Sequence, residues 1–508
     1  MLSLIQECRQ RFSNAKSHTF EAFMATNPLR SLAGQTLVYG MGTIVPRLLN
    51  YLLVPYYTRV FMQGEYGQIT ELYAYVAFFM VLLTYGMETA FFRFSQKEDT
   101  NKVFNAIFSL IIVTTTVFLL LIAFSFNFLA GLIQYSGSQE FILFTGLVVA
   151  LDAATAVPFA LLRKQNKARK FATIKLVNVV VNISLNLLFL TLIPEKSHQL
   201  SSMFFGPDSN LIIWVFIANL ISSLVSLLML FPHLKNFRWK LDFQYLKPIL
   251  RYALPVLIVG LAGMVNEVID KILLKYLLPD SKTAMQQVGI YGANYKLGVL
   301  MTLFIQMFRY AAEPFFFSHA DKKDSPELFS KVMNYFVILG LFIFLLVTLY
   351  LDFFKLLVDK SYYSGLTIVP IILMANLFYG IFFNLSIWYK LTDRTGDAGW
   401  VSVGGAAITL ILNILLIPIM GYMGSAWATL ACYFVMMLVS YFWGNKVYPI
   451  PYKTGRITLY VLAALIIYFI SRELDNIPQL FRYSINTMMF AGFALITLLI
   501  ERRQALNN

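Results

Sequence analysis

The connections between the apolar segments of this chain alternate between two kinds, one rich in lysine and arginine and one poor in them. The segments themselves have the length of membrane-spanning helices, since about 20 apolar residues cross about 30 Å of hydrocarbon. The chain is 58% hydrophobic and 13% charged, a composition that excludes a large soluble domain. We predict an all-α integral membrane protein with about fourteen spans, at residues 33–58, 69–92, 103–128, 139–162, 171–193, 210–231, 248–275, 289–312, 330–350, 364–389, 398–417, 422–444, 457–472 and 481–500.

The charge of the connections predicts the orientation of the chain. With a cytoplasmic N-terminus, the inner connections and tails contain 28 lysines and arginines and the outer connections contain seven. This bias follows the positive-inside rule, so we predict that both termini are cytoplasmic. It also explains the net charge of +14 without a nucleic-acid partner, because membrane lipid attracts a basic face. The seven outer residues are Arg59, Lys196, Lys282, Lys355, Lys360, Arg472 and Arg482.

Several residues recur at a spacing of 225, which indicates an internal repeat. Tyr66-Gly67 aligns with Tyr291-Gly292, Glu71 with Lys296, and Glu88 with Glu313. Six spans per unit give two lobes of the same orientation, and a substrate site is expected between such lobes near the midplane. The predicted units are an N-lobe at 31–232, a C-lobe at 248–446 and two further helices at 454–500, with cytoplasmic tails at 1–30 and 501–508.

Ionisable residues at membrane depth are the candidate functional residues, because each costs free energy unless it faces a partner or a cavity. A guanidinium suits a phosphate particularly well, since it donates two parallel bonds. The counter-ion of Lys296 is either a protein carboxylate, with Asp270 as the candidate, or a ligand phosphate. We consider Lys275 a snorkelling residue, and Asp152 a helix-packing group rather than a coupling carboxylate. The predicted substrate-binding residues are Arg47, Glu71, Lys271 and Lys296, the predicted ion-coupling residues are Glu267 and Asp270, and the predicted gate residues are Glu88, Arg93, Arg309 and Glu313.

Nothing in the sequence indicates an enzyme or a resident cofactor. The four histidines fall in tails and connections without metal-ligand spacing, and no GxxxxGK[ST] loop is present. Cys8 and Cys432 support neither a disulfide framework nor a metal site. We expect no cofactor other than a coupling H⁺ or Na⁺.

The segments PRLLNYLLVPYYTRVF, EYGQITELY, NEVIDK and VGIYGANYKLG resemble the Wzx-type polysaccharide transporter family of the multidrug/oligosaccharidyl-lipid/polysaccharide flippase superfamily. The resemblance implies two six-helix lobes that form a V. It also implies transport of undecaprenyl-diphosphate-linked oligosaccharides, as for O-antigen, lipopolysaccharide or capsule, across the bacterial inner membrane by ion-coupled alternating access. Arg47 resembles a first-helix arginine of the related lipid II flippases, whereas Leu52 and Leu53 lie where a further arginine of those flippases is expected.

The resemblance implies a lipid-linked oligosaccharide substrate and a glycan polymerase complex as a partner. A cation-coupled multidrug antiporter of the same superfamily is the alternative function, but an arginine in the first span disfavours organic cations. A membrane scaffold is a third reading, and intramembrane charges on several helices argue against it.

Overall fold

The described part of the chain is built of helices. The computed structural model describes residues 42–135, 139–205, 211–319, 325–392, 394–474 and 477–507, and every regular element in these ranges is helical. Thirteen helical segments within them are long and apolar enough to span a membrane. They coincide with the second to fourteenth predicted spans, which confirms a multi-pass, all-helical membrane protein. In lipid, where water is absent, a helix is the structure that satisfies all backbone hydrogen bonds within a single spanning segment.

The first predicted span is described from residue 42 onward. A helix covers 42–51 and leads into α3 (Leu53–Val60). The predicted N-terminal tail, 1–30, and Cys8 lie outside the described residues. The other elements of the N-terminal half are α4 (Gln63–Thr84), α5 (Met87–Phe94), α6 (Thr100–Leu132), α7 (Glu140–Lys164), α8 (Ala168–Leu187), η1 (Leu188–Leu192), α9 (Pro194–Phe205), α10 (Ile212–Leu230) and η2 (Phe231–Leu234).

The C-terminal half begins with the long helix α11 and ends with a hairpin. Its elements are α11 (Phe243–Leu277), α12 (Ser281–Tyr295), η3 (Lys296–Gly298), α13 (Val299–His319), α14 (Ser325–Leu349), α15 (Leu351–Phe354), η4 (Lys355–Leu357), η5 (Lys360–Ile368), α16 (Val369–Leu385), α17 (Ile387–Leu391), α18 (Thr395–Met420), α19 (Tyr422–Val447), α20 (Thr454–Glu473) and α21 (Gln479–Asn507).

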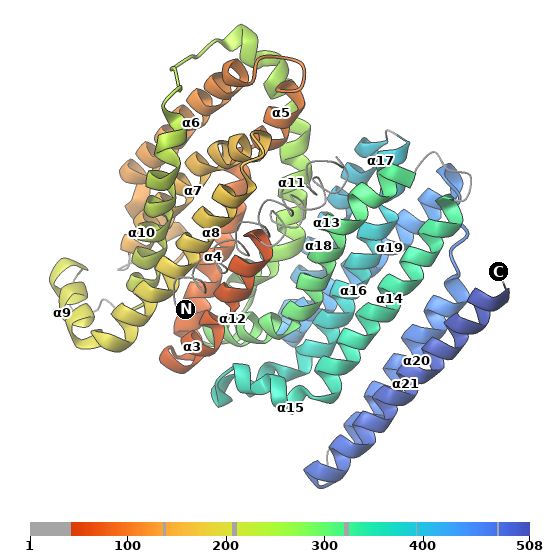
Figure 1. Cartoon of the computed structure of the whole chain (residues 1–508). Coiled ribbons are helices and arrows are strands. Elements are labelled where there is room, and N and C mark those ends of the chain that lie inside the picture. The colour runs from red at the N-terminus through yellow and green to blue at the C-terminus, as the bar shows by residue number, and fades with distance from the viewer. Residues whose placement is uncertain are drawn as a thin grey trace, which may run out of the picture.

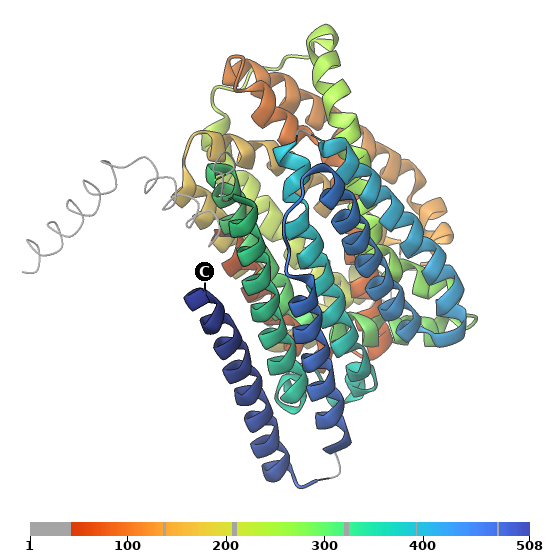
Figure 2. The same cartoon turned by 90° about the vertical axis from the view of Figure 1, so that its right-hand side faces the viewer.

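The helices form two groups, with α11 between them and the hairpin at one edge. Figure 1 shows α3 to α10 on one side and α13 to α19 on the other. In Figure 2, α20 and α21 lie beside α14, against which both pack. The limits of the predicted lobes stay a prediction, but the path of the chain places the connection 235–242 where the first group ends.

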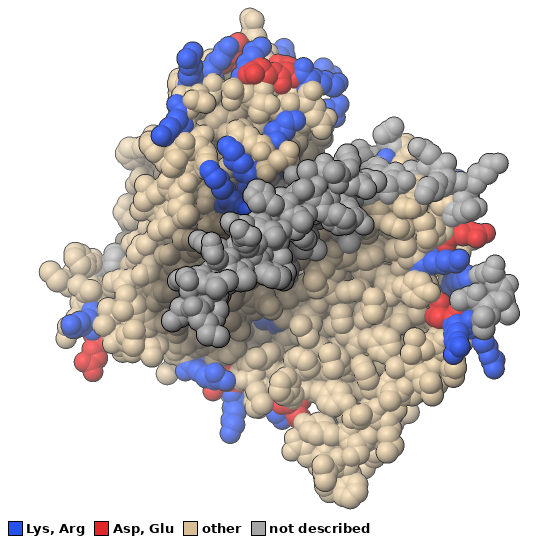
Figure 3. Space-filling model, viewed as in Figure 1, with Lys and Arg blue, Asp and Glu red and all other residues tan. Residues whose placement is uncertain are grey.

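Charged side chains are concentrated at the ends of the helices. Figure 3 shows lysine and arginine gathered at the upper end of the molecule, above a broad band with few charges. The connections between α5 and α6, between α7 and α8 and between α10 and α11 lie at this end (Figure 1). These are connections that the charge count assigns to the cytoplasm. The helices α3, α9, α12 and α15 lie at the opposite end, which we call the outer end.

The two groups contact each other closely at the outer end. Helix α12, which continues through η3 into α13 of the second group, crosses α4 of the first group at Gly67 and Gly289, where a Cβ on either glycine would collide with a backbone carbonyl of the other helix. Next to this crossing, the Tyr362 hydroxyl of η5 donates to the Phe61 carbonyl at 2.9 Å. The Asp359 amide donates to Thr58 Oγ1 at 3.2 Å. These contacts close the space between the groups at this end.

Candidate functional site

Four of the intramembrane charges that the sequence singles out lie where the first span faces α11 and the α12–α13 break. Arg47 is exposed and its Nη1 donates to Gln306 Oε1 of α13 at 3.0 Å, so it links the first span to the C-terminal half. Lys296 lies within electrostatic range of Arg47, Lys271 and Glu267. We call Arg47, Glu267, Lys271 and Lys296 the central site.

Lys296 occupies an interruption of its membrane helix. The α-helix α12 ends at Tyr295, and the 3-10 turn η3 begins at Lys296 before α13 continues. Irregular backbone at membrane depth is tolerated where it lines a cavity. The Lys296 side chain is exposed, and its Nζ lies 5.4 Å from the centre of the Tyr51 ring of the first span. The ammonium therefore faces the first span across the boundary between the groups.

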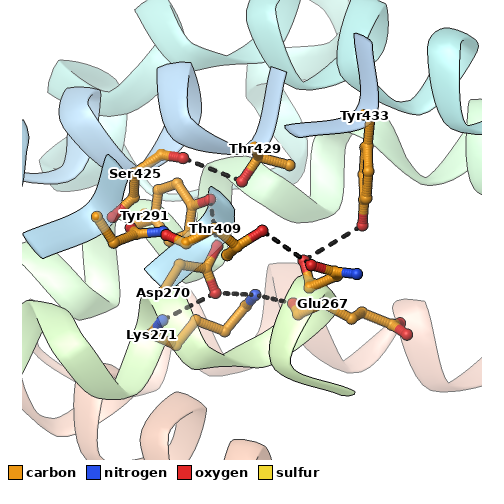
Figure 4. A network of polar contacts seen from close by, with 10 residues as sticks. Glu267, Asp270, Lys271, Tyr291, Thr409, Ser425, Thr429 and Tyr433 are labelled. Atoms are coloured by element: carbon orange, nitrogen blue, oxygen red, sulfur yellow. Dashed lines mark hydrogen bonds and ion pairs between the residues drawn. The ribbon is translucent and has the colours of Figure 1, made fainter. Parts of the chain in front are cut away.

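Lys271 is held by its neighbour in sequence, Asp270. Its Nζ lies 3.0 Å from Asp270 Oδ1 and donates to the Glu267 carbonyl oxygen at 2.8 Å. The other carboxylate oxygen of Asp270 accepts from the Tyr291 hydroxyl at 2.6 Å. Figure 4 shows Asp270 enclosed among these groups, whereas the Glu267 side chain extends away from them. The expected pairing of Asp270 with Lys296 is therefore wrong, because Lys271 and Tyr291 occupy the carboxylate.

A second polar contact joins α11 to α18 and α19 one turn away. Asn266 Oδ1 accepts from Thr409 Oγ1 at 2.9 Å, and the Tyr433 hydroxyl donates to the Asn266 carbonyl at 3.3 Å (Figure 4). Cys432 lies next to these residues and is buried, with its Sγ 3.3 Å from the Gly405 carbonyl oxygen. These contacts fix the face of α11 that carries Asp270. Among the described residues, no group of three or more His, Cys, Asp or Glu side chains is arranged to hold a metal ion.

Glu71 does not reach the central site. Its side chain is fully buried, and both of its oxygens lie 3.1 Å from Lys275 Nζ of α11. The Tyr135 hydroxyl donates to Glu71 Oε2 at 2.8 Å, and Lys275 also donates to the Ile133 carbonyl at 2.6 Å. The expected substrate role of Glu71 is therefore not supported by its position. Lys275 does not snorkel but forms a buried ion pair between α4 and α11, toward the outer end.

The described gate residues do not contact one another, and each has a partner elsewhere in the fold. Glu88 forms an ion pair with Arg163 of α7, and the Arg93 guanidinium lies 4.3 Å from the centre of the Tyr252 ring of α11. The Arg309 guanidinium lies 4.1 Å from the centre of the Phe383 ring of α16. The Glu313 side chain lies outside the described residues. In this structure, the described gate residues therefore contribute to helix packing.

A polar cluster within the N-terminal half was not predicted as a site. Lys175 lies in α8, with its Nζ 4.1 Å from the centre of the Phe159 ring. Asp152 is within electrostatic range of Lys175 and accepts from Ser223 Oγ at 2.6 Å. The interpretation of Asp152 as a satisfied packing group agrees with this hydrogen bond. The signal that identifies the cluster is a lysine eight residues into a membrane span.

Comparison with known proteins places the chain in a family. Residues 32–320, more than half of the chain, match the sequence model of the family described as polysaccharide biosynthesis protein. The chain belongs to this family. A comparison with curated proteins finds no match.

Solved structures with the same fold are transporters and flippases rather than enzymes. The chain resembles the lipid II flippase MurJ in an inward closed conformation, with a TM-score of 0.65 and 17% identity over 92% of this chain and 100% of that one. It also resembles an outward-facing MATE family multidrug resistance transporter of the MOP superfamily, with a TM-score of 0.59 and 12% identity over 85% and 96%. A Vibrio cholerae MATE transporter, VcmN, has a TM-score of 0.52 and 12% identity over 82% and 97%. The protein thus has the fold of MOP-superfamily transporters.

Proposed function

We propose that this protein translocates undecaprenyl-diphosphate-linked oligosaccharide repeat units from the cytoplasmic to the periplasmic face of the bacterial inner membrane. The observation that supports this most is the charge of the central site. Lys296 lies within electrostatic range of Arg47, Lys271 and one exposed carboxylate, Glu267, while Asp270 forms an ion pair with Lys271. The excess charge is positive at a depth where charge is costly. A diphosphate headgroup complements it, and an organic cation does not.

In the proposed mechanism, the sugars and diphosphate enter from the cytoplasmic end, because the two helix groups are joined at the outer end. Arg47 binds the diphosphate with two parallel N–H donors, and Lys296 adds a point charge on the opposite wall. The polyprenyl tail stays in lipid. The groups then rock so that the cytoplasmic end closes and the outer contacts separate, which exposes the same site to the periplasm. Family membership and the resemblance to a lipid II flippase support this cycle.

Ion coupling follows from the pairing of Asp270 with Lys271. While Asp270 is ionised, its oxygens hold the Lys271 ammonium and the Tyr291 hydroxyl. A proton or a sodium ion on Asp270 displaces Lys271, whose flexible side chain then turns toward the central site. The net positive charge of the site rises by one, and the diphosphate binds more tightly. Ion binding at Asp270 and headgroup binding are thereby coupled, and each strengthens the other by the same factor.

The first experiment is deletion of the gene in its host, followed by measurement of surface glycans and lipid-linked intermediates. We expect loss of one polymer and accumulation of its undecaprenyl-diphosphate repeat unit on the cytoplasmic side. Complementation with Arg47→Gln does not restore the polymer and does not clear the accumulated intermediate. The reason is that losing a charge-assisted bond to phosphate costs about 1.5–3 kcal/mol. Arg238→Gln is the matched control, because Arg238 is exposed on a cytoplasmic connection, and it restores the polymer.

Two results would contradict the proposal in different ways. Full complementation by Arg47→Gln at wild-type abundance would remove the role of Arg47 in headgroup binding. Intact glycans in the deletion strain, together with new sensitivity to cationic dyes, would instead indicate the multidrug antiporter. In that case the exposed carboxylate Glu267 would be the residue to test for cation binding.

A further inference from the structure

A polar cavity of about 290 Å³ lies between the C-terminal hairpin and the outer end of α14, η5 and α16. It is separate from the central site and shares none of its residues. Its charged lining residues are Asp352, Lys355, Arg472 and Arg482. Ser471 and Asn486, hydrogen bonded to each other at 2.8 Å, add polar atoms from both helices of the hairpin. We call this cavity the outer pocket.

The outer pocket carries an excess of positive charge. Asp352 is its one carboxylate, and it forms ion pairs with both Lys355 and Arg482. Arg472 is exposed and makes no ion pair with any described residue. Three cations and one carboxylate leave a charge of +2. Three of the seven lysines and arginines predicted for the outer connections therefore converge on one cavity, although the positive-inside pattern keeps this side poor in them.

A larger, apolar hollow adjoins the outer pocket on the side of the hairpin that faces α14 and α15. It measures about 850 Å³ and shares Asp352 and Lys355 with the outer pocket. The rest of its lining is mainly apolar and aromatic, from Leu346, Phe353, Phe354, Tyr483 and Phe490. A ligand that fills both spaces is anionic at one end and apolar at the other.

We propose that the outer pocket and its apolar neighbour bind one phosphate-bearing lipid, with the phosphate at Arg472 and Arg482 and the chains in the hollow. Arginine donates two parallel bonds to phosphate oxygens, and it does so best where water is scarce. Arg482 forms an ion pair with Asp352, which fixes the guanidinium in the lining of the outer pocket. The assignment of this pocket to the outer leaflet rests on the orientation in the proposed function. The chemical class of the ligand rests only on the residues that line the two spaces.

Two lipids have this chemistry, a resident anionic phospholipid and the polyprenyl diphosphate that carries the cargo. The test is native mass spectrometry of the full-length protein in detergent, titrated separately with phosphatidylglycerol, undecaprenyl diphosphate and diacylglycerol. Arg472→Gln removes a cation without breaking an ion pair to any residue in the described part of the chain. Leu346→Trp fills the apolar hollow from its wall. Lys282→Gln is the matched control, because Lys282 is exposed at the outer end outside both spaces.

We expect one phosphate lipid bound at the outer pocket of each chain and about tenfold weaker binding to Arg472→Gln and Leu346→Trp. Undecaprenyl diphosphate is titrated into these variants in the Arg47→Gln background, because the central site also binds a diphosphate in the proposed function. Lys282→Gln binds like the wild type, and diacylglycerol does not bind. Selective loss of phosphatidylglycerol identifies a resident phospholipid, and selective loss of undecaprenyl diphosphate identifies the carrier; either supports the site. Equal binding to all variants, or equal binding of diacylglycerol, overturns it. Arg47→Gln leaves binding at this pocket unchanged, so failure here is distinguishable from failure of the proposed function.

Discussion

The ion pair between Glu71 and Lys275 is the most deeply buried charge contact that the structure describes, since their side chains are 0% and 2% exposed. Removing one partner leaves the other charge without compensation, which costs about 3–5 kcal/mol in a buried pair. We therefore expect Glu71→Gln to lower the free energy of unfolding by about this amount. Thermal or denaturant unfolding of the purified protein in detergent measures it.

The matched control removes both charges. Glu71→Gln combined with Lys275→Met leaves no uncompensated charge, and we expect it to recover most of the lost stability. If Glu71→Gln alone unfolds like the wild type, Lys275 finds another counter-ion and the pair is not a structural link between α4 and α11.

Asp270 gives a second prediction at the scale of a residue. Asp270→Asn keeps the shape of the side chain but no longer holds the Lys271 ammonium as a carboxylate does. We expect headgroup binding that is independent of pH and of sodium, with transport that no longer responds to the ion gradient. Undecaprenyl-diphosphate binding across a pH series measures the first effect. A pH and sodium dependence equal to that of the wild type would exclude Asp270 as the coupling residue.

Sequence analysis singled out Arg47, Lys271 and Lys296, which the structure brings together, but it did not give the partners of the other intramembrane charges. Arg47, Lys271 and Lys296 are grouped at one site, because each lies mid-span on a helix that borders the boundary between the groups. The Glu71–Lys275 pair was not predicted, since 204 residues separate its members and a helical period does not state which helices are neighbours. The predicted partner of Asp270 was wrong because the Lys271 side chain reaches the carboxylate of its neighbour in sequence. Helical spacing does not indicate such a contact, since consecutive residues point in different directions.

At the scale of helices, the crossing of α4 and α12 is the closest approach between the two groups. We expect Gly289→Ala to push these helices apart, because its Cβ would meet the Gln63 carbonyl. The expected result is loss of stability of about 1–3 kcal/mol, as for overpacking elsewhere, measured by thermal unfolding. Gly64→Ala is the matched control on α4, since a Cβ there meets nothing within 4 Å. Equal changes in stability from both substitutions would mean that the change in helix propensity, and not the crossing, determines the effect.

The spans themselves were predictable because their signal is local and strong. The second to fourteenth predicted spans each coincide with a helix of the structure. The interruptions were not predicted: the span at 69–92 breaks between α4 and α5, where Tyr85 and Gly86 have φ of +30° and +74°. A Cβ at Gly86 would meet the Ala253 carbonyl oxygen at 2.9 Å. Such a break depends on a helix far away in sequence, so a hydropathy pattern does not contain it.

For the whole molecule, alternating access requires the outer contacts to separate during every cycle. The Asp359 amide donates to Thr58 Oγ1 at 3.2 Å across these contacts, so cysteines placed at both positions are neighbours that an oxidant is used to cross-link. We expect Thr58→Cys with Asp359→Cys, in a protein whose Cys8 and Cys432 are replaced by alanine, to lose glycan export when oxidised. Reduction restores it, and each single cysteine variant exports normally under both conditions.

The bond tests the cycle rather than the stability of the fold, because it joins residues that already touch. A cross-linked protein therefore keeps its central site, and we expect it to bind undecaprenyl diphosphate as tightly as the reduced form. Loss of transport with retained binding means that substrate enters from the cytoplasmic end and is trapped behind a closed outer end. Export that continues at complete cross-linking would contradict this, since the lipid headgroup would then leave by a path that never opens the crossing of α4 and α12.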